Sequence, residues 1–308
     1  MLNEKNEIIG SSPIMTRWNK ILIVLAALLT ALYILSFTRS CTSKDSREKI
    51  KTSLVNQKYK DSIVSFEFKD ATGSLTITNK GDFWTVSTLP ASNERMQSFI
   101  NNLITVRNLY KISDKINKNS TLGLTTGTEF HLKYSTQDTS HELIFGNQDF
   151  SLSSRYMMTE KSTQVYEIDS SLDTYLSTSV QNWAEPFIVS QLVFGKITPQ
   201  DIQRTSVINQ NHLTSISDTQ KLLDLRHGGI PGEEELLSAL QNSKTPDTTI
   251  TLELGNKNEI ELKIYPTKSE NEYIVITEYH KQKGDSPYYT SVSKISSWTY
   301  NKIKEITL

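Results

Sequence analysis

The longest apolar run of the chain extends from Ile21 to Phe37 and contains no charged residue. At about 1.5 Å per residue, a helix of this length crosses most of a hydrocarbon core of about 30 Å. We therefore expect one transmembrane helix over residues 20–38, after a disordered N-terminus at 1–19. The apolar side chains of this anchor are Ile21, Leu22, Ile23, Val24, Leu25, Leu28, Leu29, Leu32, Ile34, Leu35 and Phe37.

The same run resembles a signal peptide less than an uncleaved signal-anchor. Its apolar core exceeds the roughly 7–15 residues of a signal-peptide core, and no A-x-A cleavage site follows. The single cysteine, Cys41, excludes an intramolecular disulfide and a cysteine-based metal site. Lipidation of Cys41 stays open as an alternative, although Arg39 near the cleavage point suits a lipoprotein signal poorly.

The flanking charges bear on the orientation of the anchor. Lys5, Arg17 and Lys20 precede the run, whereas Arg39, Lys44, Arg47, Lys49 and Lys51 follow it. The positive-inside rule alone would keep the C-terminal part in the cytoplasm. A large domain behind an N-terminal signal-anchor is commonly translocated, however. We expect a single-pass protein of the bacterial cytoplasmic membrane whose C-terminal domain is extracytoplasmic.

Beyond a charged stalk at residues 39–61, apolar and polar residues alternate as they do in half-buried strands. The first unit is expected at 62–190. Its clearest helix begins after Ser92, a good N-cap, and places an apolar stripe at helical spacing from Met96 to Ile104. The expected strands of this unit lie at 62–68, 75–77, 83–86, 130–134, 143–145, 156–158 and 165–168.

A similar order of elements recurs at 191–308, which we expect to be a second unit. Leu223 and Leu225 lead to Ile230-Pro231, a helix is expected at 233–241, and alternating hairpins follow from Ile250 onward. We therefore predict an α+β fold of two similar strand–helix–hairpin–hairpin–helix units with antiparallel sheets.

Composition and motifs exclude several classes of function. The net charge of −1 gives no basic footprint for nucleic acid. Neither a Walker loop nor G-x-G-x-x-G occurs, so the chain is not expected to bind nucleotide. The five histidines lack metal-ligand spacing. We expect no cofactor, no metal site and no catalytic residue.

The loop His227-Gly228-Gly229 is the most distinctive short motif. It resembles the oxyanion loop of esterases, but no G-x-S-x-G accompanies it. A tight turn before the helix at 233–241 explains it equally well, since glycine adopts positive φ. Glycine also lets another backbone approach closely. His227, Gly228 and Gly229 are therefore a candidate partner-contact loop, and a hydrolase using His227 is the less favoured alternative.

Five tyrosines crowd the last hairpins and suggest a second alternative. They are Tyr265, Tyr273, Tyr279, Tyr288 and Tyr289. Such residues usually form cross-strand pairs and cover the core of a sheet. Exposed rings would instead provide a platform for glycan or peptidoglycan.

Several segments resemble the domain of unknown function 4340 family. These are Leu122-Gly123-Leu124, the hairpin ending in Ile144-Phe145-Gly146, Arg155-Tyr156, and the stretch from Val165 to Leu172. Proteins of this kind are often encoded beside ABC exporter components of the gliding-motility type. The resemblance implies a non-enzymatic accessory protein whose partners are the membrane and an ABC-type permease or another envelope protein. It carries over no catalytic residue.

Overall fold

A computed structural model of the chain describes residues 20–33, 47–115, 121–125, 127–209, 212–269 and 271–307. The chain divides into two compact units, Met1–Glu48 and Lys49–Leu308, and each is described by itself.

In the unit Met1–Glu48, the structure describes a helix at residues 20–33 and the residues Arg47 and Glu48. The apolar side chains of this helix from Ile21 to Leu32 are 54–68% exposed. Among the described residues, no helix combines the length and the apolar character needed to cross a membrane. Three residues of the predicted anchor, Ile34, Leu35 and Phe37, lie outside the described residues, as does Cys41.

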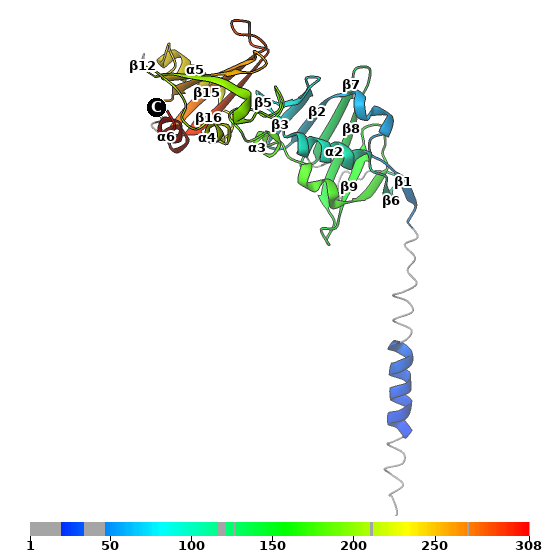
Figure 1. Cartoon of the computed structure of the whole chain (residues 1–308). Coiled ribbons are helices and arrows are strands. Elements are labelled where there is room, and N and C mark those ends of the chain that lie inside the picture. Colours follow the sequence, from blue (N-terminus) through cyan, green and yellow to red (C-terminus); the bar gives the residue numbers. More distant parts are fainter. Residues whose placement is uncertain are drawn as a thin grey trace, which may run out of the picture. The chain divides into compact units, whose positions relative to one another are not determined.

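The unit Lys49–Leu308 consists mainly of antiparallel β-sheet with several helices, which confirms the predicted α+β character (Figure 1). Within the described residues, its first sheet has ten strands. In spatial order these are β1 (Lys49–Thr52), β6 (Arg107–Ser113), β10 (Val165–Asp169), β9 (Ser154–Thr159), β8 (Ser140–Gln148), β7 (Phe130–Thr136), β2 (Ile63–Asp70), β3 (Gly73–Asn79), β4 (Trp84–Val86) and β5 (Leu89–Pro90).

Helix α2 (Asn93–Ile104) covers one face of this sheet, as its sequence predicts. The hydroxyl of Ser92 accepts a hydrogen bond from the backbone of Arg95 and caps the helix. Phe99 packs its ring 5.0 Å from that of Phe66 and 5.6 Å from that of Phe68, between ring centroids. Alternation along β2 places both phenylalanines on the covered face.

The second sheet has six strands in the described part of the chain. Their spatial order is β12 (His212–Thr214), β11 (Ile202–Asn209), β13 (Thr248–Leu254), β14 (Glu259–Pro266), β15 (Glu272–His280) and β16 (Tyr289–Ser296). Ile260, Leu262 and Ile264 of β14 face a buried core, together with Val275 and Tyr279 of β15. The helices α4 (Thr219–Leu223) and α6 (Ser297–Glu305) belong to this half.

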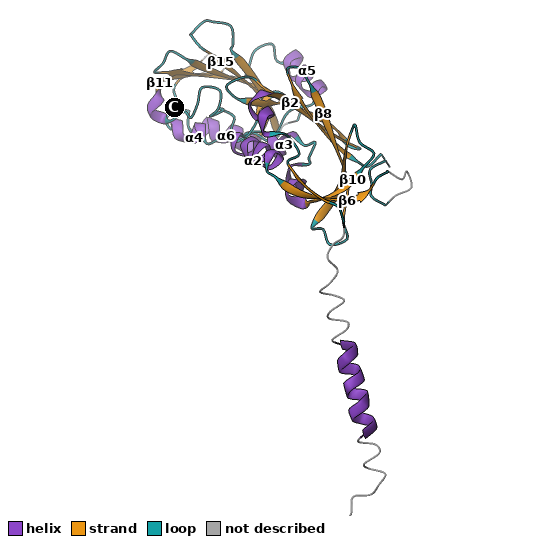
Figure 2. Cartoon of the chain, turned by 90° about the vertical axis from the view of Figure 1, so that its right-hand side faces the viewer, coloured by secondary structure: helices purple, strands orange, loops and turns teal. Residues whose placement is uncertain are grey.

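Helix α5 (Glu233–Asn242) lies against the other face of the second sheet. Its Ala239 packs with Tyr265 and Ile274, which alternate with the core-facing residues of β14 and β15. Figure 2 shows α5 on one side of the sheets and α2, α3 (Val180–Trp183), α4 and α6 on the other. The helices predicted after Ser92 and at 233–241 are α2 and α5. In Figure 2 they lie on opposite sides of the sheets.

The two sheets meet where β5 lies beside β16. The hydroxyl of Thr88 donates to the carbonyl of Val292, and the hydroxyl of Tyr289 donates to the carbonyl of Thr88. The Phe83 ring packs edge-on against Tyr289, 5.1 Å between centroids, and belongs to the core of the second sheet.

Two local expectations differ from the observed structure. The segment expected as a stalk at 39–61 contributes β1 and the 3₁₀ turn η1 (Gln57–Ser62), and the compact unit begins at Lys49. Leu223 ends the helix α4 rather than lying in a strand, because Asp218 caps that helix by accepting a hydrogen bond from Lys221.

Candidate functional site

The predicted partner-contact loop is used inside the molecule. The backbone N–H of Gly228 donates to the carbonyl of Lys294, at 2.7 Å, and the N–H of Lys294 donates to the carbonyl of Gly229, at 2.9 Å. The loop therefore pairs with the edge strand β16. Gly229 has φ +120°, and a β-carbon there would lie 2.8 Å from the amide of Gln181. Glycine is favoured at this position by its conformation, whereas the end of the flexible Gln181 side chain can move aside.

His227 is held by the backbone on both sides of its ring. Nε2 lies 2.7 Å from the carbonyl oxygen of Glu185, and Nδ1 accepts a hydrogen bond from the N–H of Gly229 at 3.1 Å. This network assigns the proton to Nε2. Burial lowers the pKa of His227, and the bond to Glu185 partly opposes this. In this arrangement both ring nitrogens of His227 contact backbone groups.

A buried carboxylate lies next to His227 in the chain segment between the sheets. Glu185 accepts from the hydroxyl of Ser190 at 2.5 Å and from the backbone of Gln191 at 3.1 Å. The backbone N–H of Ser190 in turn donates to the hydroxyl of Tyr279 at 2.7 Å. Burial raises the pKa of Glu185. These bonds fasten the connecting segment to β15, and no sequence motif indicated them.

The remaining histidines lie on strands. Register pairs His131 with Ile144 and His141 with Tyr134. His131 Nδ1 lies 2.7 Å from Glu142, and the ring of His141 stacks on that of Tyr134. His212 is exposed on β12, and His280 lies at the end of β15.

The tyrosines of the last hairpins do not form an exposed platform. Tyr279 is fully buried, and Tyr265 is 9% exposed. The ring of Tyr273 packs 4.1 Å from that of Tyr300, between centroids. Tyr288 is 37% exposed and bonds to Asp82. These rings cover cores, and the glycan alternative loses the feature that motivated it.

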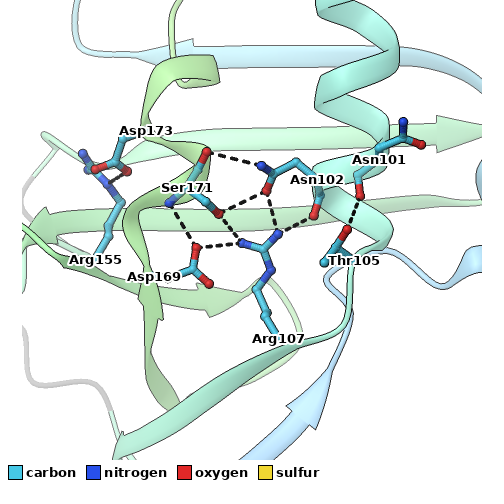
Figure 3. Close-up of polar contacts among 8 residues, drawn as sticks. All are labelled: Asn101, Asn102, Thr105, Arg107, Arg155, Asp169, Ser171 and Asp173. Atoms are coloured by element: carbon cyan, nitrogen blue, oxygen red, sulfur yellow. Dashed lines mark hydrogen bonds and ion pairs between the residues drawn. The ribbon is translucent and has the colours of Figure 1, made fainter.

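The segments that suggested a family come together at one end of the first sheet. Figure 3 shows Arg107 of β6 among polar groups from α2, β10 and the 3₁₀ helix η2 (Ser170–Tyr175). Its guanidinium donates to the hydroxyl of Ser171 at 2.8 Å and to the side chain of Asn102 at 2.6 Å. Arg107 is 8% exposed, so these bonds replace its hydration.

A second guanidinium supports the neighbouring strands. Arg155 of β9 lies 2.6 Å from the carboxylate of Asp173 and donates to the carbonyl of Gly146. Gly146 packs directly under Leu122, where a β-carbon would lie 2.1 Å from the Leu122 carbonyl oxygen. The carbonyl of Leu122 accepts from the backbone of Asn147. The Leu122-Gly123-Leu124 and Ile144-Phe145-Gly146 segments are therefore packing partners.

The loop between β8 and β9 exposes two large apolar side chains. We name residues 149–153 the β8–β9 loop. Phe150 at its tip is fully exposed, and Leu152 is 66% exposed with φ +58°. Bulky residues rarely adopt this conformation, which costs about 1–3 kcal/mol.

The same loop is internally ordered. Asp149 accepts hydrogen bonds from the backbone of Ser153 and Ser154, both at 3.0 Å, and from the hydroxyl of Ser151 at 2.5 Å. The backbone of Leu152 donates to the carbonyl of Asp149. The polar residues thus satisfy the backbone, while the two apolar side chains point to solvent.

Comparison with family models gives one match, to a domain of unknown function (DUF4340), over residues 84–261. The chain belongs to the DUF4340 family. The matched range begins in β4 and ends in β14, so it includes both arginine networks, the β8–β9 loop and the His227 loop. It extends well beyond the segments between Leu122 and Leu172 on which the resemblance rests. Searches of curated proteins and of solved structures find no match.

Proposed function

We propose that this DUF4340 protein is a non-catalytic accessory component of an ABC-type export complex. It is held in the bacterial cytoplasmic membrane by one anchor and binds an envelope partner outside the cytoplasm. The observation that carries the proposal is the β8–β9 loop, because it presents Phe150 and Leu152 to solvent on a hydrogen-bonded frame.

The helix at 20–33 supports the membrane anchor. Its apolar side chains from Ile21 to Leu32 are at least 54% exposed, and they follow Lys20 without an intervening charge. Water is a poor solvent for such a surface, at roughly 25 cal/mol for each exposed apolar Å². A bilayer removes this cost when the apolar run extends to Phe37.

The geometry of the β8–β9 loop supports binding of a protein partner. Burial of a phenylalanine side chain contributes roughly 1.5–3 kcal/mol, and aromatic anchors in partner pockets are common hot spots. Since the loop is already ordered by Asp149, little conformational entropy is lost when Phe150 enters a pocket. We assign that pocket to the large extracytoplasmic domain of the permease.

The contacts of the histidines support a role without catalysis. Both ring nitrogens of His227 bind backbone groups, and His131 binds Glu142. None of these contacts is with a hydroxyl group. The less favoured hydrolase function has no support from this arrangement.

We propose further that the two halves, 62–190 and 191–308, are repeats of one unit. The order β3-β2-β7-β8-β9-β10 of the first sheet corresponds to the order β12-β11-β13-β14-β15-β16 of the second. The helices α2 and α5 lie on opposite sides of the sheets. The proposed repeat therefore includes the strands and their order but not the positions of these helices. Native-state hydrogen exchange tests this: two separate cooperative units support the repeat, and one global unit contradicts it.

Affinity capture of the full-length chain from detergent-solubilised membranes tests the main proposal. We expect the wild type to recover an ABC permease, identified by mass spectrometry. The double variant Phe150→Asp, Leu152→Asp should reduce this recovery at least about tenfold, because a charge in an apolar pocket is left unpaired. The control is Trp298→Asp, an equally drastic change at an exposed apolar residue of α6, 67% exposed.

Two results would contradict the proposal. One is that the wild type recovers no ABC permease, and the other is that both variants recover it equally. Protease accessibility of the folded part in intact cells, compared with lysed cells, tests the orientation. Cleavage confined to lysed cells would place that part in the cytoplasm.

A further inference from the structure

A charged cluster lies on the outer face of the second sheet, away from the β8–β9 loop in sequence. Register places Glu261 of β14 directly opposite Glu278 of β15. Lys263 and His280 follow at alternate positions, so their side chains share this face. The ammonium of Lys263 lies 3.1 Å from Glu261 and 2.9 Å from Glu278.

His280 is the unusual member of this cluster. Its Nδ1 lies 2.8 Å from the backbone carbonyl oxygen of Asp285, so Nδ1 carries the proton and donates. In the neutral ring, Nε2 then holds a lone pair. That atom is buried without a hydrogen-bond partner, and the residue is 7% exposed.

The lone pair of His280 faces a carboxylate. Nε2 lies 3.5 Å from a carboxylate oxygen of Glu278, and both atoms are acceptors. Two acceptors at this distance are unfavourable unless a proton or a metal ion lies between them. Lys263 already contacts Glu278 but has no contact with the imidazole among the interactions of the described residues.

We propose that Glu261, Glu278 and His280 bind a divalent transition-metal ion, with His280 coordinating through Nε2. Imidazole and carboxylate together suit Zn²⁺ and its neighbours in the transition series. The bond from Nδ1 to the Asp285 carbonyl is the outer-shell contact that fixes the tautomer of metal-ligating histidines.

The geometry requires a modest adjustment of side chains. The three ligand atoms lie within 4.8 Å of one another, whereas tetrahedral ligands at about 2.1 Å from a metal lie about 3.4 Å apart. Glu261 and Glu278 have side chains that are 28% and 20% exposed, so their torsions can change without disturbing the core.

Lys263 is the competitor of the metal. Its ammonium neutralises the two glutamates in the metal-free protein, and its flexible stem lets it move toward solvent when an ion enters. Replacement by methionine keeps the stem and removes the charge. Metal affinity should therefore rise in Lys263→Met.

His131 shows why the inference is restricted to His280. Its Nδ1 already lies 2.7 Å from Glu142, and its Nε2 lies 3.7 Å from Glu129. The side chain is 29% exposed. That ring is paired with carboxylates on both sides, and among the described residues it has no backbone contact that fixes its tautomer.

The test is titration of the full-length protein in detergent with Zn²⁺ by calorimetry and with Co²⁺ by visible absorption, after EDTA treatment. We expect one saturable site, with affinity raised at least about tenfold in Lys263→Met. Glu278→Gln and His280→Gln should lower it by about 10–100-fold or more. Matched controls are Lys294→Met, on the same face of β16, and His212→Gln, exposed on β12; both should stay within about twofold of the wild type.

Three outcomes would overturn the site: no Co²⁺ absorption band in Lys263→Met, unchanged affinity in His280→Gln, or displacement of Co²⁺ by equimolar Mg²⁺. If His280→Gln does not fold, the imidazole nitrogen resonances of the wild type decide. A metal-induced shift of Nε2 supports the site, and an unchanged Nε2 refutes it.

Discussion

The guanidinium of Arg107 lies 3.3 Å from the carboxylate of Asp169, across 62 residues of sequence. The arginine side chain is 6% exposed and the aspartate 49%. Asp169 also accepts from the backbone of Ser171 and caps η2. One buried cation thus joins the end of α2, the strand β6 and the start of η2.

Arg107→Met should lower the free energy of unfolding by about 2–3 kcal/mol, because the hydrogen bonds that the buried guanidinium donates to Asn102 and Ser171 are lost. The half-exposed Asp169 regains water, which limits the loss. Urea unfolding followed by circular dichroism measures it. Lys133→Met is the control: its 45% exposed side chain lies 3.9 Å from Glu67, and its loss should cost less than about 0.5 kcal/mol. Equal effects in both variants would contradict the role of the network.

Trp183→Ala should destabilise the protein by about 3–5 kcal/mol. The indole is fully buried, packs 4.9 Å from Phe68 and 5.1 Å from Phe99 between centroids, and donates to the carbonyl of Ser177. Trp298→Ala removes the same side chain from an exposed site, and its cost should stay below about 1 kcal/mol. Tryptophan fluorescence is altered by both variants, so unfolding is followed by circular dichroism. A small cost for Trp183→Ala would refute its place in the core.

His227 should make stability pH-dependent in one direction. Because burial lowers its pKa in the folded state, the unfolded chain binds the proton more readily below about pH 6.5. The contribution of His227 to the free energy of unfolding is therefore complete above about pH 6.5 and is lost as pH falls. Glu185 acts oppositely, since burial raises its pKa and folding favours its protonated form.

The difference between wild type and His227→Gln isolates the histidine, since Glu185 is common to both. Glutamine can still donate to the Glu185 carbonyl. Between pH 7.5 and pH 5.5, the free energy of unfolding should decrease more in the wild type than in His227→Gln. A parallel decrease would show that His227 titrates normally in the folded protein.

Gly146→Ala should destabilise the first sheet by about 1–3 kcal/mol, because the added carbon would lie 2.1 Å from the carbonyl oxygen of Leu122. The segment at 121–125 must move to admit it. Gly73→Ala is the control: nothing lies within 4 Å of its added carbon, and the change should be neutral or slightly stabilising. Thermal unfolding compares the two. Similar melting temperatures would contradict the close packing of the Leu122-Gly123-Leu124 segment.

Local chemistry predicted the elements whose signal lies within a few residues. The capping of α2 by Ser92 and its buried stripe from Met96 to Leu103 follow from helical periodicity. The pairing of Tyr134 with His141 follows from the position of a polar turn. The strands β1 and β6 were not predicted, because their apolar positions alternate weakly and their partners lie far away in the sequence: β1 pairs with β6, and β6 also pairs with β10.

The sequence by itself determined the apolar run at 21–37, the α+β character, the family resemblance and most strands, since these depend on periodicity and composition. Only the tertiary structure decided that His227 faces backbone groups, that Phe150 faces solvent, and that Glu261 lies opposite Glu278 and near His280. Those relationships arise where chain segments far apart meet. Their geometry is set by strand register and by which buried polar groups must find partners, and neither quantity is encoded in any single window of residues.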